Sequence, residues 1–461
     1  MRNLEHEKRI AMDNTRLATF RNGLALCAAI AVATAAFTAH AAWTYDAEAK
    51  TLSNSENGYS FPVVEVSIAD PASATGEKIS GLQIEGQATA GSGDLDFTSM
   101  ETDTGYKLIS IREYDHPQIL NGIEGCTKFI APDLMQLGRQ AFQVYTALTE
   151  IVVSAKLTKI PYYSLNGTTG LKKITPSEFP YVTKVEQGAL QGSAIEAISL
   201  PNVKQIDGYA FQSFKGLVGD LSFPQLETAG DQAFYGATKI TSVSAPKLNQ
   251  TAASLFAGCS ELTNLVLGAG CTADGLKNKA YANCPKLENI TPAPVITSLS
   301  VSPFSTESQD TAYFKSNPLV IKVSGTTSIS GSYMKHIPSL KYVEITCENI
   351  ESVGAWAFQN IADDAEITWE GPAPTTISEY AFYGDVNSTL KRKRLIVKGG
   401  DANLESWKAS TYFSELTEDD KTGKLSADYQ EAKKLGRVEG KIGSYLWLVK
   451  GWTSGMMILI R

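Results

Sequence analysis

Hydrophobic positions recur along this chain in a phrase that repeats about every 23 residues. The phrase is an aliphatic residue, a short polar stretch that often contains Gly, and then Ala-Phe or a close variant. We term its last position the anchor; the steps between anchors range from 21 to 30 residues. A period of this length predicts a solenoid, in which each coil buries its apolar side only against its neighbours. The anchors are Phe142, Leu165, Leu190, Phe211, Phe234, Phe256, Tyr281, Phe304, Met334, Phe358 and Phe382.

A second phrase, Leu-x-x-Ile/Leu/Val, follows many of the anchors, for example at Leu148, Leu262 and Leu340. Its alternation of apolar and polar positions indicates a strand with one buried face. We therefore predict a β-rich solenoid in which each unit contributes one parallel strand, while the anchor fills the coil from the opposite side. Gly before the anchor is expected to permit a turn with positive φ. Six phenylalanines are predicted as the structural anchors: Phe142, Phe211, Phe234, Phe256, Phe358 and Phe382.

Taken together, three motifs resemble the BspA-like leucine-rich repeats of bacterial surface and secreted proteins. They are the Ile-x-x-x-Ala-Phe unit, the Gly-Cys-x-x-Leu phrase at 258–262, and a Pro after the strand. The resemblance covers roughly residues 119–413 and implies a curved leucine-rich-repeat superhelix on an exported protein. Adhesion or host-protein binding is known for some members, and the resemblance implies no catalytic residues. Because members differ in their partners, it does not name a ligand.

The chain divides into four predicted segments. They are a signal peptide at 1–41, a β-rich N-terminal cap at 42–118, the repeat solenoid at 119–413, and a charged linker with a small C-terminal β unit at 414–461. A cap is expected because an open solenoid end exposes its core and an unpaired strand edge. Leu404 and Trp407 have helical spacing. The runs 445–449 and 456–460 predict the two strands of the C-terminal unit.

The N-terminus has the features of an export signal. Arg16 and Arg21 precede an apolar run at 23–37, and small residues around Ala41 and Ala42 suit cleavage. The run is shorter than the roughly 20 residues of a membrane span, which disfavours an anchor. The mature chain is therefore predicted to be secreted or at the cell surface without a transmembrane span. Two start codons, Met1 and Met12, are compatible with this interpretation.

Charge and cysteine content exclude several other classes. The net charge of −8 does not suit nucleic-acid binding. The five cysteines that remain after the signal peptide are an odd and sparse set, which is not a disulfide framework. Cys259 and Cys284 lie 25 residues apart, about one coil, so they either pair or form a buried column; we favour the column. No Cys-x-x-Cys motif indicates zinc, and no metal site is predicted.

No catalytic or cofactor motif stands out. His116 and His336 follow the signal peptide in loop-like contexts, and no Gly-x-Ser-x-Gly elbow marks a nucleophile. Neighbouring carboxylates are better explained as polar turns than as a glycosidase or calcium site. The pairs are Asp94 with Asp96, Asp363 with Asp364, and Asp419 with Asp420. Phosphate-loop and dinucleotide fingerprints are missing, so we predict no cofactor and no enzymatic activity.

We therefore predict a non-enzymatic, exported protein that binds a protein or glycan outside the cell through a broad repeat surface, with adhesion as one expression of that binding. Tyr209, Tyr235 and Tyr383 adjoin the anchors and are candidate binding aromatics, since Tyr is enriched at binding hot spots. The alternatives are a structural component of the cell envelope with no specific external ligand and, less favoured, a glycan-active enzyme.

Overall fold

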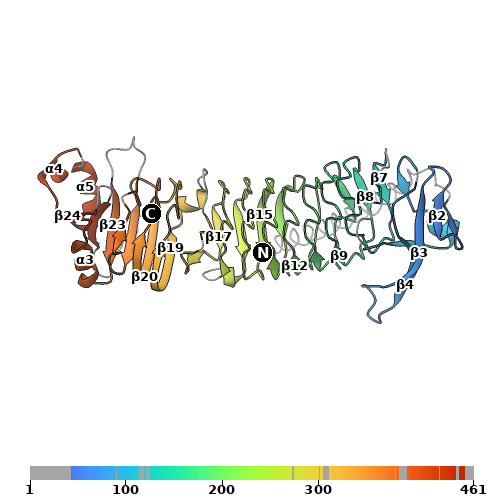
Figure 1. Cartoon of the computed structure of the whole chain (residues 1–461), viewed down its shortest axis with the longest axis horizontal. Helices are drawn as coiled ribbons and strands as arrows, with labels where there is room; N and C mark the ends of the chain where they lie inside the picture. The colour runs from blue at the N-terminus through green and yellow to red at the C-terminus, as the bar shows by residue number, and fades with distance from the viewer. Residues whose placement is uncertain are drawn as a thin grey trace, which may run out of the picture.

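The described residues form a long rod, with the β-strands that follow residue 43 at one end and the helices that follow residue 400 at the other (Figure 1). A computed structural model describes residues 43–451 except 90, 114–118, 121–124, 272–274, 301, 305–310, 379, 384–391, 425 and 443–445. The predicted signal peptide with its cleavage site, His116 and the strand expected at 456–460 lie outside the described residues. One continuous hydrophobic core runs along the rod from Trp43 to Leu448.

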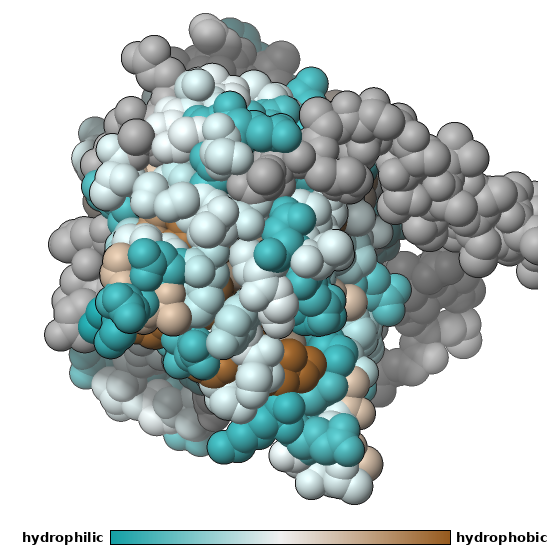
Figure 2. Space-filling model, turned by 90° about the vertical axis from the view of Figure 1, so that its right-hand side faces the viewer, coloured by the Kyte–Doolittle hydropathy of each residue, from teal (hydrophilic) through white to brown (hydrophobic). Residues whose placement is uncertain are grey.

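A twisted sheet with the strand order β1-β2-β3-β4-β6 closes the N-terminal end. Its first four strands pair antiparallel, and β4 pairs parallel with β6. The strands of this sheet are β1 (Trp43–Asp46), β2 (Thr51–Asn54), β3 (Ser60–Ala69), β4 (Lys78–Ile84) and β6 (Leu108–Ile111). Between β4 and β6 lie β5 (Leu95–Asp96), which belongs to the next sheet, and the helix α2 (Met100–Thr104). Polar residues cover most of this end, and hydrophobic residues show only in small patches (Figure 2). The sheet therefore shields the apolar interior of the first coil from water.

Short parallel strands stack along the rod in successive sheets. The first sheet contains β7 (Lys128–Ile130), β8 (Glu150–Val152) and β10 (Lys173–Thr175). On a second side lie β9 (Lys159–Ile160), β11 (Lys184–Val185), β12 (Gln205–Ile206) and β14 (Thr228–Ala229). The third contains β13 (Gly219–Ser222), β15 (Ile240–Ala245), β16 (Asn264–Leu267) and β17 (Asn289–Thr291). The last sheet is the longest, and its first strands are β18 (Val295–Ile296), β19 (Leu319–Ile329), β20 (Tyr342–Val353), β21 (Glu366–Glu370) and β22 (Thr376–Ile377). In the described residues, the 3-10 turns η2 (Ala269–Cys271) and η4 (Ala312–Lys315) interrupt this pattern, and η4 lies within the longest step between anchors.

The Leu-x-x-Ile phrase forms the predicted strand. In β16, Leu265 and Leu267 are buried, while Asn264 and Val266 face solvent. Leu265 pairs in register with Val243 on one side, and β17 continues the same parallel ladder on the other. The alternation in the sequence is therefore the alternation between core and solvent across the stack.

The six phenylalanine anchors are all buried, with exposed fractions of at most 3%. Phe234 stacks between Phe211 and Phe256, with ring centroids 5.2 and 5.5 Å apart and interplanar angles of 9° and 15°. Phe358 and Phe382 stack in the same way at 5.4 Å. In these coils the buried rings therefore form a central column.

The glycine before the anchor plays a different part from the one predicted. Gly188 has the expected positive φ of 61°, but Gly208 and Gly230 do not. A Cβ on Gly230 would lie 2.4 Å from the backbone nitrogen of Gly208 in the preceding coil. The glycine is needed there because two coils approach closely, and the left-handed conformation falls instead on Tyr209 after Gly208 and on Gln232 after Gly230.

We expect Gly230→Ala to lower the free energy of unfolding by about 1–3 kcal/mol, because the added methyl forces two backbones apart. Urea denaturation followed by circular dichroism measures this loss. Gly86→Ala is the matched control, since its Cβ would meet only the Cγ of Pro62 at 3.3 Å. Equal stability of the two variants would contradict the close-approach argument.

Parallel pairing continues beyond both ends of the predicted solenoid segment. Strand β5 pairs with β7, so the stack already begins inside the segment predicted as the cap. At the other end, β26 pairs parallel with β23 instead of forming a separate unit. Strand β25 was not predicted; it pairs antiparallel with β26. The remaining elements are β23 (Lys393–Lys398), α3 (Asp401–Lys408), β24 (Phe413–Ser414), α4 (Glu418–Thr422), α5 (Ser426–Lys433), β25 (Gly436–Ile442) and β26 (Leu446–Gly451).

The helical spacing of Leu404 and Trp407 corresponds to α3, which buries both side chains. The charged segment that follows contains α4 and α5, and α5 packs against β25 and β26. Here Ala432, Val438 and Trp447 form a second, smaller hydrophobic cluster. The helices therefore cover the outer face of the last strands, which a regular coil would leave open.

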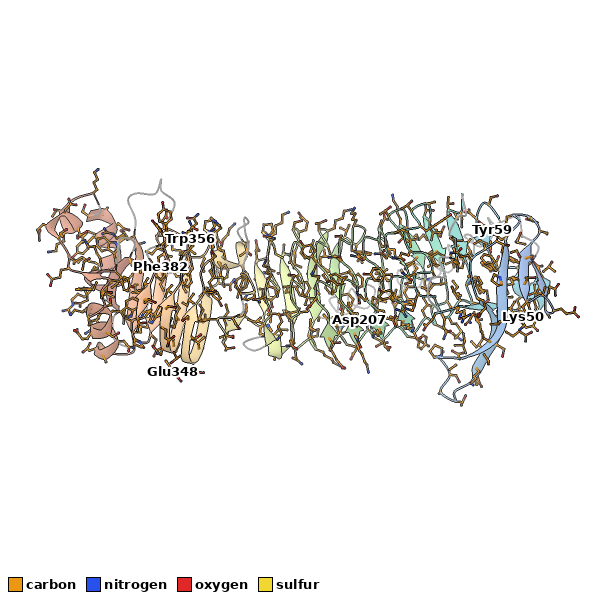
Figure 3. The ribbon with its side chains drawn as sticks, in the orientation of Figure 1. Lys50, Tyr59, Asp207, Glu348, Trp356 and Phe382 are labelled. Carbon is orange, nitrogen blue, oxygen red and sulfur yellow. The ribbon has the colours of Figure 1, made fainter. Side chains whose placement is uncertain are left out.

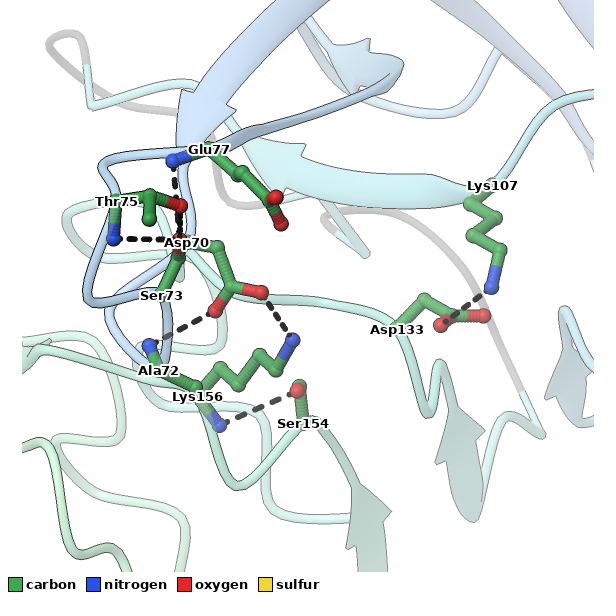
Figure 4. Close-up of polar contacts among 9 residues, drawn as sticks. All are labelled: Asp70, Ala72, Ser73, Thr75, Glu77, Lys107, Asp133, Ser154 and Lys156. Atoms are coloured by element: carbon green, nitrogen blue, oxygen red, sulfur yellow. Dashed lines mark hydrogen bonds and ion pairs between the residues drawn. The ribbon is translucent and has the colours of Figure 1, made fainter.

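The turn of the β3–β4 hairpin reaches the side of the solenoid (Figure 4). The Asp70 carboxylate accepts a hydrogen bond from the Lys156 ammonium at 2.6 Å and from the Ala72 backbone N–H at 2.9 Å. The hydrogen bond from Lys156, followed by that from Ala72, lowers the pKa of Asp70. This contact connects a cap residue with a coil residue 86 positions away in the sequence.

We expect the hairpin turn to loosen in acid. Because the folded-state pKa of Asp70 is lowered, its contact stabilises the turn above the ordinary aspartate pKa of about 3.9 and is lost as pH falls through the lowered value. Hydrogen exchange of residues 70–77 at pH 6 and pH 3, corrected for intrinsic rates, should show lower protection in acid. Lys156→Gln should remove this difference, and a difference that persists in the variant would contradict the assignment.

Candidate functional site

Around nine of the anchors, the described chain reverses its direction through two residues in the left-handed region that flank the anchor. Around Phe211 these are Tyr209, with φ of 61°, and Ser213, with φ of 52°. The intervening Ala210 and Phe211 point inward, so the side chains at the two left-handed positions are directed to the surface. Non-glycine residues adopt this conformation only at a cost, which implies a compensating interaction.

The compensation is a ladder of backbone hydrogen bonds between coils. The N–H groups of Tyr209, Phe211 and Ser213 donate to carbonyls of the next coil at 3.0, 2.7 and 2.7 Å. The same bonds recur around Phe142 and Met334. Backbone hydrogen bonds therefore join the turns of successive coils, as they join neighbouring strands of a sheet, and hold the turns in a fixed arrangement.

We define the turn strip as the residues two before, one after and two after each anchor. The described members two before an anchor are Gln140, Tyr163, Gly188, Tyr209, Gln232, Ser254, Lys279, Ser302, Ser332, Trp356 and Tyr380. Those one after are Gln143, Asn166, Gln191, Gln212, Tyr235, Ala257, Ala282, Lys335, Gln359 and Tyr383. Those two after are Val144, Gly167, Gly192, Ser213, Gly236, Gly258, Asn283, His336 and Asn360. Among these described positions no side chain is a carboxylate, although the chain as a whole carries a net charge of −8.

An amide ladder crosses five coils of the turn strip. The Gln143 amide donates to Asn166 Oδ1 at 3.4 Å, and Asn166 Nδ2 donates to Gln191 Oε1 at 2.9 Å. Gln191 donates to Gln212, whose Nε2 donates to Gln232 Oε1 at 3.1 Å. Each side chain is half-buried, so the ladder fixes its orientation while leaving part of it in contact with solvent.

Exposed aromatic residues gather at the C-terminal end of the turn strip. Trp356 and Tyr380 are 44% and 41% exposed and occupy equivalent positions on successive coils. Tyr380 meets Tyr383 edge to face, with centroids 5.8 Å apart, and the Lys335 ammonium lies 5.6 Å from the Trp356 ring centroid. Figure 3 places Trp356 near the upper edge of the rod, opposite Glu348. We term Trp356, Tyr380 and Tyr383 the aromatic cluster.

A polar pair lies beside the aromatic cluster. The Asn360 amide and His336 Nδ1 are 3.0 Å apart, and both residues have left-handed backbones. Burial, together with the charge of Lys335, lowers the pKa of His336. The imidazole is therefore neutral at physiological pH, which leaves lysine as the cation at this end of the described strip.

The three predicted tyrosines all lie on the turn strip but in two places. Tyr209 is half-buried, and Tyr235, which is 41% exposed, follows it on the next coil. Tyr383 belongs to the distant aromatic cluster. Trp356 and Tyr380 were missed, although they precede Ala-Phe as Tyr209 does, which was the available signal. A binding role for the three tyrosines stays a prediction.

All five cysteines of the described chain are free and buried. The Cys259 thiol donates to the Phe234 carbonyl at 3.1 Å, and the Cys284 thiol donates to the Phe256 carbonyl at 3.1 Å. Burial raises the pKa of Cys284 to about 12. Each thiol thus caps a backbone carbonyl of an earlier coil, in keeping with the buried column that we favoured.

The carboxylate pairs serve local structure where they are described. Asp94 accepts from the backbone N–H groups of Thr127 and Lys128, each at 2.8 Å, which fixes the start of β7. Burial would raise the pKa of Asp420, but hydrogen bonds from Lys441, Thr417 and Arg392 outweigh it and hold that pKa well below its usual range. Within the described ranges, no three His, Cys, Asp or Glu side chains are grouped to hold a metal ion.

The stacked coils and their repeated surface define a leucine-rich-repeat protein. The segments 118–218, 217–324 and 311–392 match the model of the BspA type leucine rich repeat region, with 6 copies. Together they span more than half of the 461 residues, and the chain therefore belongs to the BspA-type leucine-rich repeat family. No curated protein matches the chain.

Three solved bacterial structures are similar at low identity. A leucine rich cell surface protein from Faecalibacterium prausnitzii is 16% identical, with 82% of this chain and 100% of that chain covered and a TM-score of 0.36. Leucine-rich repeat proteins from Bacteroides ovatus and Eubacterium ventriosum are 15% and 13% identical, with TM-scores of 0.26 and 0.24. The alignment with the Bacteroides ovatus protein covers 73% of this chain and 94% of that protein. The alignment with the Eubacterium ventriosum protein covers 70% of this chain and 96% of that protein. The family assignment therefore rests on the repeat match.

No helix in the described part of the chain combines the length and the apolar character that crossing a membrane requires.

Proposed function

We propose that this protein is exported and binds a macromolecule outside the cell through the surface of its coils, without catalysing a reaction. The observation that carries the proposal is the aromatic cluster, in which large side chains are exposed on a scaffold rigidified by hydrogen bonds between coils. Aromatic side chains held this way lose little conformational entropy on binding, which favours their use as anchors for a partner.

The export part of the proposal rests on the sequence around Ala41 and Ala42 together with membership of a family whose proteins include bacterial surface proteins. N-terminal sequencing of the protein recovered from the culture medium or cell envelope would test it. A mature start near Ala42 supports export, whereas an intact N-terminus in the cytoplasm contradicts it.

The binding part is tested with the purified chain from residue 42 onward on an array of extracellular-matrix proteins and glycans. A saturable signal that weakens in a Trp356→Ala/Tyr380→Ala double variant supports the proposal. An empty array, combined with stable assembly of the protein into the envelope fraction, would favour the structural role instead. Measurable turnover of a glycan or peptide would revive the enzyme hypothesis.

A further inference from the structure

Building on the proposed function, we infer that the turn strip is a binding site for a neutral glycan chain, which lies along the rod with its sugar rings on the aromatic cluster. The inference goes beyond the general binding role because it names the surface and the chemical class of the ligand. It rests on the charge of the strip, its hydrogen-bonding groups and the setting of its aromatic rings.

The strip differs in charge from the other faces of the rod. On the strand faces, charged side chains of successive coils pair: Lys173 with Glu150 at 2.6 Å, and Lys184 with Asp207 at 3.2 Å. The turn strip contains amides, hydroxyls, aromatics, one imidazole and small or aliphatic residues at the described positions, with Lys279 and Lys335, two coils apart, as its lysines. Such a surface creates no strong potential of either sign, so it favours an uncharged ligand over an acidic or basic one.

The amide ladder has hydrogen-bonding capacity to spare. A glutamine or asparagine side chain has two N–H donors and two acceptor lone pairs. The ladder bonds of Gln191 and Gln212 use one donor and one lone pair of each side chain. What remains is a donor and an acceptor lone pair on each of these two side chains. Sugar hydroxyls both donate and accept, so a row of oriented amides complements a row of hydroxyls.

The aromatic cluster supplies the apolar half of the site. Trp356 is held by a backbone N–H that donates to the Tyr380 carbonyl at 3.2 Å, and its ring is 44% exposed. The face of an aromatic ring carries negative electrostatic potential, which attracts the polarised C–H bonds on the face of a pyranose ring. Because Trp356 and Tyr380 lie one coil apart, about 5 Å along the rod, they suit consecutive parts of one chain.

A folded protein partner fits this surface less well. A stable protein interface needs about 800 Å² from each partner and a central, fully desolvated cluster. The turn strip is three residues wide on each coil, and its exposed aromatics are concentrated at one end. Of the other large exposed hydrophobic residues, Val144 and Tyr235 lie singly elsewhere on the strip, and Val218, Val266 and Tyr342 lie at other positions of the coils. A narrow surface that runs from coil to coil along the rod matches an extended polymer.

Affinity gel electrophoresis tests the inference with the chain from residue 42 onward. The gels contain xyloglucan, galactomannan, laminarin or pullulan as neutral probes, and polygalacturonate as an anionic probe. We expect retardation by at least one neutral probe and none by polygalacturonate. Trp356→Ala and Tyr380→Ala should each weaken that retardation at least tenfold, whereas Trp356→Phe, which keeps a ring, should weaken it less.

Tyr342→Ala is the matched control, because Tyr342 is 40% exposed but lies on β20, away from the strip. It should leave retardation unchanged, and circular dichroism should show that every variant is folded. Retardation that Trp356→Ala and Tyr380→Ala do not affect overturns the inference. So does saturable binding to immobilised matrix proteins without retardation by any neutral probe, although the proposed function then survives. Failure to bind either class of ligand overturns both.

Discussion

Phe234→Asp is expected to unfold the central coils of the solenoid. The Phe234 ring is 1% exposed and stacks between Phe211 and Phe256. Losing a buried Phe side chain costs about 3–5 kcal/mol, and the new carboxylate must be either buried without a partner or protonated, which adds to the cost. Because each coil is stabilised by its neighbours, the loss should spread to the coils on both sides.

Urea denaturation and limited proteolysis measure this effect. Tyr235→Asp provides the control, since it introduces the same charge one residue further along, at a side chain that is 41% exposed. Surface substitutions of this kind change stability by about 0.5 kcal/mol or less. A Phe234→Asp midpoint as high as that of Tyr235→Asp would be incompatible with a column of stacked anchors.

Asp428→Ala is expected to release the C-terminal helices from the last strands. The Asp428 carboxylate accepts hydrogen bonds from Arg394 Nη2 at 2.6 Å and from Trp447 Nε1 at 2.8 Å. The side chains of Asp428 and Arg394 are only 4% and 6% exposed. Removing one partner leaves a buried guanidinium uncompensated, which costs about 3–5 kcal/mol. Protease cleavage within α4 and α5 should accelerate, and the denaturation midpoint should fall.

Two variants separate this ion pair from general effects on α5. Lys434→Ala breaks the solvent-exposed pair with Glu431 just after the same helix and should cost less than about 1 kcal/mol. The double variant Arg394→Met/Asp428→Leu replaces both charges with apolar groups and should recover the part of the loss that comes from the uncompensated guanidinium, while Trp447 Nε1 and the Arg392 backbone N–H stay without their acceptor. If Asp428→Ala were as stable as Lys434→Ala, the buried pair would not hold the helices in place.

Much of the fold was evident from local pattern. The anchors, the strand phrase and the helix containing Leu404 and Trp407 depend on whether a side chain points to the core or to solvent, and that choice repeats in the sequence with the coil. The family assignment follows from the same periodicity. The prediction that Phe234 lies in a central column needed no knowledge of its neighbours, because every coil must fill its own centre.

The features that depend on contacts between coils were not predictable in this way. The steps between anchors vary from 21 to 30 residues, so the sequence does not say which residues of successive coils align. The close approach at Gly230 and the grouping of Trp356 with Tyr380 became evident only when the coils were stacked. The same holds for Lys156, which meets Asp70 across 86 residues, and for β26, which joins the parallel sheet beside β23.

The sequence by itself therefore determined the repeat, the buried anchors and the class of protein, because these depend on a burial pattern that each coil repeats locally. The tertiary structure decided which surface side chains lie together, since the register between coils is set by backbone hydrogen bonding and close packing across the stack. The turn strip is a product of that register. It joins residues that are about one coil apart in the chain into one surface without a carboxylate at its described positions.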